Sequence, residues 1–339
     1  MSISSSLLDD NLLEIKRKND KYAFLCGIVS QFLWGMSNIQ LKTYRTYFPK
    51  EFSLNSLTFW RSLCIFLIGY LMILKKNERI KRINEIEKKN QIWFWLRSQG
   101  NYFLIIFWVI ELGYFRVSTC QSFANCNPII VLILSYFFLK EPFYFRYAFG
   151  VFISLIGTLM IISNEGNNND LSNNNNLDNN NDHINNINLL FGIIVASTHL
   201  TLVSFSNFGQ KILCNEKMSG EVQNFYLGLL STIPSFIVNI FQWHFGFSNL
   251  FYVIYAFSNG ILFFLANYFL AECLNYMPIN KFAPMNYLKI VFLFVFGFII
   301  LGEKVYLSDI IGSILILGFQ VYNVYFPVKK RKEGINIQK

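Results

Sequence analysis

The stretch that decides the fold is Ser135–Gly150, SYFFLKEPFYFRYAFG, because its pattern returns at Gly297–Gly312, GFIILGEKVYLSDIIG. Both copies carry a Glu two residues after a Leu, a Tyr three residues after that Glu, and a Gly at the end. A shift of 162 residues aligns 106–150 with 268–312 without a gap. An internal repeat of this length indicates that the chain is built from two copies of one structural unit.

The amino-acid composition is that of a membrane protein. Hydrophobic residues make up 53% of the 339 residues and charged residues only 14%, whereas about a quarter of a soluble domain is charged. The 37 Phe residues are more than one water-soluble core could bury. Residues 1–21 are polar and do not resemble a cleaved signal, so we expect insertion through the first apolar run.

Ten apolar runs are long enough to cross the bilayer core, which takes about 20 helical residues. Lys and Arg are enriched in cytosolic loops, and with both termini in the cytosol 22 of the 29 Lys and Arg residues fall on that side and five on the other. We therefore predict an all-α integral membrane protein with both ends cytosolic. The predicted spans are 22–44, 54–74, 99–115, 118–138, 144–163, 189–210, 222–242, 250–272, 279–301 and 305–326.

The spans divide into two repeats of five helices. The first repeat covers 22–163 and the second 189–327, with a cytosolic tail at 1–21 and a basic cytosolic tail at 328–339. The segment between them, 164–188, has 14 Asn among 25 residues and is predicted to be a disordered, non-cytosolic loop. Because five is an odd number, the second repeat must be inverted relative to the first, which places a cavity between them at mid-depth.

The order of the motifs resembles the EamA domain, the repeat unit of the drug/metabolite transporter superfamily. The family pattern is a Pro, an apolar helix, Leu-x-Glu and two later glycines, matched here by Pro128, Leu139, Glu141, Gly150 and Gly157. The second copy matches with Leu301, Glu303, Gly312 and Gly318, although its Pro284 lies too far upstream. Trp34 and Gly35 resemble the family's opening helix, and Arg61 matches an Arg that the family often carries in its second span.

The Leu-x-Glu motif closes one helix just before the next begins. We expect the carboxylates of Glu141 and Glu303 to accept N–H bonds from the start of the helix that follows, and Gly150 and Gly312 to let helices pack closely. A structural role is favoured for both Glu residues. The alternative is a role in gating or ion coupling.

Charged and titratable groups within spans are candidates for handling a solute. Lys289 lies mid-span at the position that Asn127 holds in the first copy. It is either a cation that faces the cavity or a Lys that snorkels to the surface or is permanently paired. His199 is a deep histidine that either takes up protons or is held by a hydroxyl group. Glu111 and Glu272 lie near span ends, where solvation and proton coupling are equal alternatives.

Further polar residues lie in spans that line the cavity in the resembled family. As a set they predict a polar, hydrogen-bonding cavity rather than a greasy drug pocket. They are Trp34, Ser37, Asn38, Gln121, Asn125, Asn267 and Asn286.

The resemblance implies a secondary active transporter of a small polar, or anionic, metabolite that works by alternating access without a cofactor. Its partners would be the solute and the lipid bilayer, with a proton or counter-solute as the coupling species. The basic segment 75–97 is explained by topology and anionic lipid headgroups rather than by nucleic acid. The alternatives are a non-transporting scaffold or receptor and a membrane-embedded lipid-modifying enzyme. We predict no catalytic or metal-binding residues, since there are only three His and none of the six Cys forms Cys-x-x-Cys.

Overall fold

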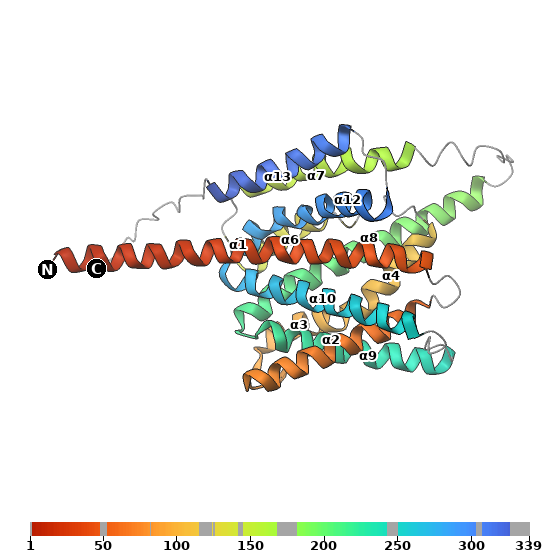
Figure 1. Cartoon of the computed structure of the whole chain (residues 1–339), viewed down its shortest axis with the longest axis horizontal. Coiled ribbons are helices and arrows are strands. Elements are labelled where there is room, and N and C mark those ends of the chain that lie inside the picture. Colours follow the sequence, from red (N-terminus) through yellow and green to blue (C-terminus); the bar gives the residue numbers. More distant parts are fainter. Residues whose placement is uncertain are drawn as a thin grey trace.

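Helices make up the structure, a computed structural model that describes residues 2–47, 53–81, 83–114, 124, 126–141, 145–167, 182–242, 250–302 and 307–325. Over these ranges there is no strand (Figure 1). The helices are α1 (Ser2–Tyr47), α2 (Leu54–Lys76), α3 (Gln91–Ser98), α4 (Gly100–Tyr114), α6 (Asn127–Phe138), α7 (Phe145–Asn167), α8 (Asp182–Asn215), α9 (Gly220–Gln242), α10 (Leu250–Tyr276), α11 (Ile279–Phe282), α12 (Leu288–Leu301) and α13 (Leu307–Tyr325).

Five helical segments within the described ranges are long and apolar enough to cross a membrane. They are Asn55–Lys76, Leu190–Asn215, Gly220–Gln242, Leu250–Tyr276 and Ile279–Ile300. The all-helical membrane fold is thereby confirmed, whereas the count of ten spans stays a prediction. The last of the five is not a regular α-helix throughout, because the short 3-10 helix Ala283–Tyr287 separates α11 from α12.

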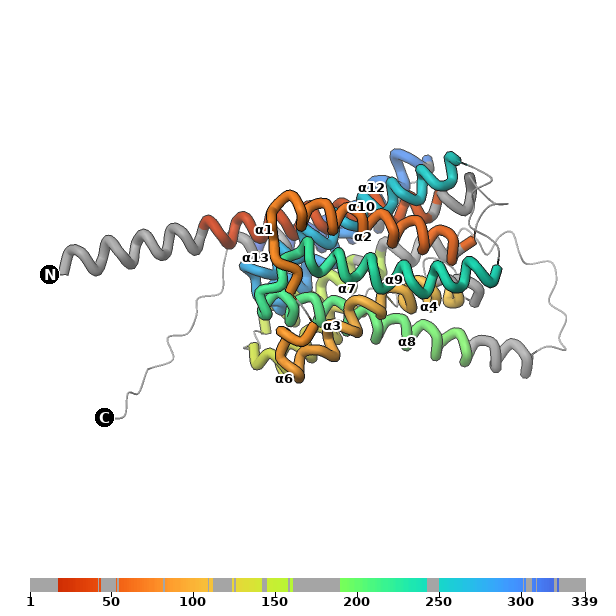
Figure 2. The backbone as a smooth tube through the Cα atoms, turned by 90° about the horizontal axis from the view of Figure 1, so that it is seen from below, coloured from red at the N-terminus to blue at the C-terminus, as the bar shows by residue number. Residues whose placement is uncertain are grey.

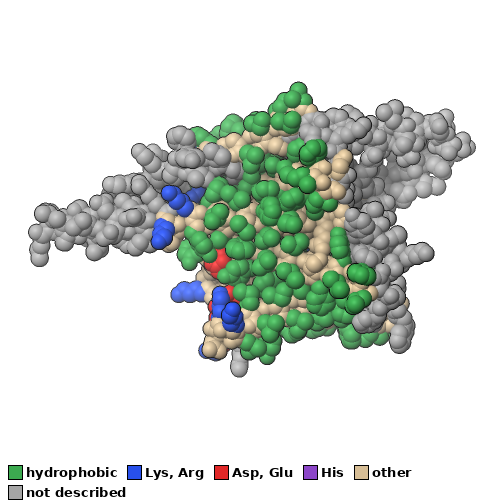
Figure 3. All heavy atoms as spheres, in the orientation of Figure 1, with side chains coloured by type: hydrophobic (Ala, Val, Ile, Leu, Met, Phe, Trp, Pro, Cys, Tyr) green, Lys and Arg blue, Asp and Glu red, His purple; other side chains and the backbone are tan. Residues whose placement is uncertain are grey.

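The outer surface carries large apolar side chains that water would not favour. Phe145, Phe241 and Phe251 are each more than three-quarters exposed. Figure 3 shows one face of the molecule on which hydrophobic side chains predominate and the Lys and Arg side chains gather at one end. An apolar face of this extent is suited to contact with lipid.

The helices of the two halves pack against one another. α1 packs on α10, α2 on α9 and α7 on α13, and the helices share a common long direction in both views (Figures 1 and 2). Each helix has a counterpart in the other half: α8 corresponds to α1, α3 and α4 together to α10, and α6 to α12. When every helix is replaced by its counterpart, the same pairs of neighbours are found. For example, the contact of α1 with α10 becomes that of α8 with α3 and α4, and the contact of α1 with α12 becomes that of α8 with α6. This exchange is what two similar units related by a two-fold axis produce.

Glycine allows the close approach of α7 and α13. A Cβ atom built on Gly157 would lie 2.7 Å from the carbonyl oxygen of Gly312 and 3.0 Å from Ile316, and a Cβ on Gly150 would overlap the ring of Phe319. Close backbone contact of this kind replaces side-chain volume in membrane helix pairs.

We therefore expect Gly157→Leu to destabilise the protein by about 1–3 kcal/mol through overpacking. The melting temperature in detergent measures the effect. Gly318→Leu, also on the α7–α13 pair, is the matched control because nothing lies within 4 Å of its added Cβ. Equal melting temperatures for the two variants would contradict the packing argument.

The helix ends differ from the expected boundaries in two places. α1 begins at Ser2, so the predicted tail 1–21 continues into the first span as one helix. α7 continues to Asn167 and α8 starts at Asp182, so both ends of the Asn-rich segment are helical rather than disordered. Helix propagation explains both extensions, because each added residue gains a hydrogen bond once a long helix exists. Residues 168–181 and the predicted tail 328–339 lie outside the described residues.

Candidate functional site

Two interrupted helices meet at the centre of the bundle. In the first half, α6 begins at Asn127, directly before Pro128. In the second half, the 3-10 helix Ala283–Tyr287 precedes α12, which carries Lys289 in its first turn. The 162-residue shift aligns Asn127 with Lys289, so the two breaks occupy equivalent positions in the repeats.

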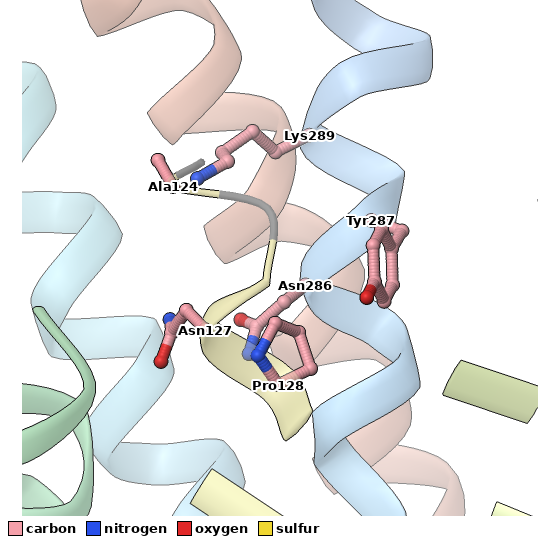
Figure 4. Close-up of a pocket in the computed structure, with 6 residues that line it drawn as sticks. All are labelled: Ala124, Asn127, Pro128, Asn286, Tyr287 and Lys289. Atoms are coloured by element: carbon pink, nitrogen blue, oxygen red, sulfur yellow. The ribbon is translucent and has the colours of Figure 1, made fainter. Parts of the chain in front are cut away.

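A small cavity lies between the two breaks (Figure 4). Its volume is about 10 Å³, counted as the space open to the centre of a water-sized sphere, which is room for about one water molecule. Equivalent positions of both repeats line it, so the cavity lies close to the axis that relates the halves. The lining residues within the described part of the chain are Ala124, Asn127, Pro128, Asn286, Tyr287 and Lys289.

Lys289 brings a positive charge to this cavity. Its side chain leaves α12 and reaches toward Ala124 of the other half (Figure 4). Among the described residues no carboxylate pairs with its ammonium group. The side-chain oxygen of Asn127 is buried and has no hydrogen-bond partner among the described residues. No side chain forms a capping hydrogen bond at the N-terminus of α6. An ammonium group, amides and the positive end of a helix are together suited to binding an anion.

Polar contacts extend from the cavity along α1. Gln31 donates a hydrogen bond to the side-chain oxygen of Asn286 at 3.4 Å. One turn along α1, the ring of Trp34 packs edge-on against the ring of Phe263 on α10, with 4.6 Å between the ring centroids. The guanidinium group of Arg61 lies 3.7 Å from the centroid of the same Phe263 ring, and its Nε atom is buried without a hydrogen-bond acceptor among the described residues. The structure thus brings Trp34 and Arg61 together around one aromatic ring.

A second buried arginine lies one turn farther along α10. Arg97 of α3 donates hydrogen bonds to the side-chain oxygen of Asn267 and, at 3.0 Å, to Ser206 of α8. Gln210 donates to the backbone oxygen of Asn267 at 3.1 Å. Arg97 belongs to the basic segment 75–97, which is predicted to be cytosolic, but its side chain is only 4% exposed and joins both halves. The eight-residue helix α3 continues almost directly into α4. This continuity places the side chain of Arg97 inside the bundle.

The centre therefore holds three cations without a matching acid. Within the described part of the chain, no carboxylate forms an ion pair with Lys289, Arg61 or Arg97. Burying a charge costs several kcal/mol unless a partner or a ligand compensates it. This excess of positive charge is the main electrostatic feature of the bundle interior.

His199 lies away from this centre and contacts Glu111. Its Nδ1 atom is 2.9 Å from Oε2 of Glu111, and both side chains are buried. Glu111 is predicted to lie near the end of its span, but α4 packs against α8 and the Glu111 side chain is fully buried.

The other predicted residues have separate places. Ser37 accepts hydrogen bonds from Asn259 through its backbone and hydroxyl oxygens at 3.0 and 3.1 Å, which joins α1 to α10. Asn38 is half-buried on α1. Gln121, Asn125 and Glu303 lie outside the described residues.

Glu141 contacts a different helix from the one expected. Its carboxylate oxygens accept hydrogen bonds from the backbone N–H groups of Ile279 at 3.4 Å and Asn280 at 3.3 Å, at the start of α11 in the other half. This contact differs from the predicted cap of the following helix, before which residues 142–144 lie outside the described part of the chain. Lys140, with φ of 51°, turns the chain sharply after α6, and the carboxylate lies against α11. Lys211 donates to the backbone oxygens that close α10, those of Leu274 at 2.5 Å and Met277 at 3.1 Å.

We call these contacts of Glu141, Lys211 and residues 274–280 the Glu141 latch. Burial raises the pKa of Glu141 above its ordinary value, and the N–H groups of Asn280 and Ile279 and the charge of Lys211 oppose this rise. Other contacts at the same end join segments predicted to be cytosolic. They are Lys281 with Asp20 at 3.7 Å, Lys81 with Glu216 at 3.4 Å, and Lys76 with Glu221.

Comparison with known proteins supports this architecture. The model of the EamA-like transporter family matches residues 21–163 and 190–322, one match for each half. A search of curated protein sequences finds no match. One solved structure, described only as a crystal structure of a protein, has 14% sequence identity and a TM-score of 0.68, covering 89% of this chain and 97% of its own. At that identity the likeness concerns the fold alone.

Proposed function

The chain belongs to the EamA-like transporter family, and from that premise we propose that it carries a small polar anion across a membrane by alternating access. The observation that carries the proposal is the excess of positive charge, from Lys289 at the cavity and from the buried Arg61 and Arg97. A solute with carboxylate or phosphate oxygens compensates these charges. The compensation favours an anion over a neutral molecule of the same shape.

Lys289 is the first ligand of this anion. The amides of Asn127 and Asn286 donate hydrogen bonds beside it, and the N-terminus of α6 adds its positive end. The cavity now has room for about one water molecule, so the solute enters only after the two halves move apart.

Ten helices in two inverted repeats provide that movement. The Glu141 latch joins the halves at the end assigned to the cytosol, so opening toward the cytosol breaks it. The 162-residue shift aligns Glu141 with Glu303, and Ile279 and Asn280 with residues 117 and 118. While the Glu141 latch stays closed, the solute can exchange only with the opposite side.

Uptake into proteoliposomes tests the function. The panel holds carboxylates and phosphate esters, each beside a neutral counterpart, such as succinate with succinamide and glycerol 3-phosphate with glycerol. We expect at least one anion to enter protein-containing vesicles faster than protein-free vesicles, while its neutral counterpart does not. Equal entry of both members of each pair would contradict anion selectivity. No entry of any member, with folded and monodisperse protein, would favour the scaffold or receptor.

A further inference from the structure

The contact between Glu111 and His199 is a buried acid–base pair that the anion site does not use. Glu111 is fully buried on α4 of the first half, and His199 is 5% exposed on α8 of the second. Apart from the 2.9 Å contact between them, neither oxygen of Glu111 has a hydrogen-bond donor among the described residues. The ring of Trp108 lies 5.4 Å from that of His199 and shields one side.

We propose that this pair is a proton-binding site that couples anion movement to a proton gradient. The proposal rests on the transport function argued above. With a proton bound, the pair is an imidazolium beside a carboxylate and carries no net charge. After the proton leaves, a neutral imidazole beside the carboxylate has a net charge of −1. One proton therefore enters the pair from one side with the solute and leaves on the other side, and nothing else is consumed.

Helix α8 places the pair where its charge acts on the anion site. Ser206, which accepts a hydrogen bond from Arg97, is seven residues from His199, or about 10 Å along the helix. At an effective dielectric constant of about 20, a unit charge about 10 Å from a bound anion changes the affinity for that anion about tenfold. Arg97 is one of the cations that the anion compensates. The unprotonated pair repels the anion, whereas the protonated pair does not. Proton and anion therefore favour each other's binding, as linkage requires.

No other charged group contacts the pair in the described part of the chain, so its charge is set by its own proton. The helices packed against α4 and α8 do carry such groups, none of them at ion-pair distance from either residue. The charged groups are Arg61, Lys75 and Lys76 on α2, Arg97 on α3, Glu221 on α9 and Glu272 on α10, with Lys211 on α8 itself and the titratable Tyr102 on α4.

Two transport measurements on reconstituted protein separate coupling from transport. Exchange of labelled for unlabelled succinate or glycerol 3-phosphate, without a pH difference, reports movement alone. Accumulation against a gradient, driven by a pH difference of one unit with the membrane potential held at zero by K⁺ and valinomycin, reports coupling. One proton per solute supports about tenfold accumulation.

We expect the wild type to do both, and Glu111→Gln and His199→Gln to keep exchange but lose accumulation. Glu221→Gln is the control, because Glu221 is an equally buried carboxylate in an ion pair with Lys76, and it should keep both. Accumulation that survives in Glu111→Gln, or exchange without accumulation in the wild type, would overturn the coupling. Loss of exchange in the wild type would instead contradict the transport function, and the coupling would fall with it.

A second measurement detects proton uptake by His199 directly and requires no solute. Infrared difference spectra of the purified wild type on acidification should contain an imidazolium signal that is weaker in His199→Gln, in which the other two His remain. Spectra that are unchanged by the substitution would show that His199 takes up no proton, and would overturn the proposal even if the variants transport poorly.

Discussion

Replacing Lys289 by Met is expected to lower the kcat/KM of anion uptake about a hundredfold. Met keeps the length and the apolar stem of the side chain and removes only the charge that the solute compensates. A hydrogen bond to a charged group contributes about 1.5–3 kcal/mol to the binding free energy. Its loss leaves the bound anion without its first ligand. Entry of the neutral counterparts should stay at the level of protein-free vesicles in both proteins. Uptake of matched anionic and neutral solutes in proteoliposomes measures both effects.

The stability of the same variant separates a binding role from a structural one. An uncompensated charge beside the cavity destabilises the empty protein, so Lys289→Met should melt at the same temperature as the wild type or higher. Lys289→Arg should retain part of the anion uptake, because the charge remains while its geometry changes. Lys75→Met, an exposed site at the end of α2, is the matched control for loss of one positive charge. A lower melting temperature with unchanged uptake in Lys289→Met would return Lys289 to a structural role.

Replacing Glu141 by Ala is expected to open the bundle at the end assigned to the cytosol. The substitution removes the acceptor of two buried backbone N–H groups, those of Ile279 and Asn280. Leaving buried donors unpaired costs about 1–3 kcal/mol, which shifts the equilibrium toward the open state about 10- to 100-fold. Cys273 reports the shift, because it is fully buried on α10 near the latch.

The experiment labels Cys273 with a maleimide in a variant whose other five cysteines are replaced by Ser. Labelling should become about 10- to 100-fold faster in Glu141→Ala. Glu141→Gln keeps an acceptor oxygen for only one of the two N–H groups, so its labelling rate should lie between those of the wild type and Glu141→Ala. Glu87→Ala is the control, since Glu87 is exposed and forms an ion pair with the exposed Lys89. Unchanged labelling in Glu141→Ala would show that the carboxylate does not hold the two halves together.

The pH dependence of labelling follows from the raised pKa of Glu141. Because burial raises this pKa in the closed latch, the closed state binds the proton more tightly than an open state with an exposed carboxylate. Acidification through the range just above the ordinary pKa of Glu, about 4.3, therefore favours the closed state and slows labelling of the wild type. Because the thiolate is the form that reacts, labelling slows on acidification in every variant. The labelling rate of the wild type should therefore fall more steeply than that of Glu141→Ala.

The sequence pattern was sufficient to predict the helical membrane fold and the equivalent positions of Asn127 and Lys289 in the two repeats. The repeat aligned these two residues directly, and they line one cavity in the structure. Contacts between distant segments were not accessible in the same way. The partner of Glu141 lies 138 residues away at Ile279, whereas capping rules concern local sequence. Arg97 follows a basic loop, so a count of charges by segment could not show that α3 turns it inward.

The pairing of Glu111 with His199 was missed for a related reason. Position along a span predicts depth in the membrane but not which helix covers a side chain, and it is α8 that encloses Glu111. Hydropathy treats both residues alike as polar interruptions of apolar runs. Only the packing of the first half on the second shows that an acid and a base face each other.

The most direct test of the account is counterflow. Vesicles that contain the purified protein are loaded with a high concentration of one unlabelled anion from the panel and diluted into a trace of the same anion in labelled form, without any ion gradient. A carrier that alternates between two closed sides accumulates label transiently above the outside concentration, and this is the result that we predict for the wild type. Label that only equilibrates, or that enters no faster than in protein-free vesicles, would contradict transport by alternating access.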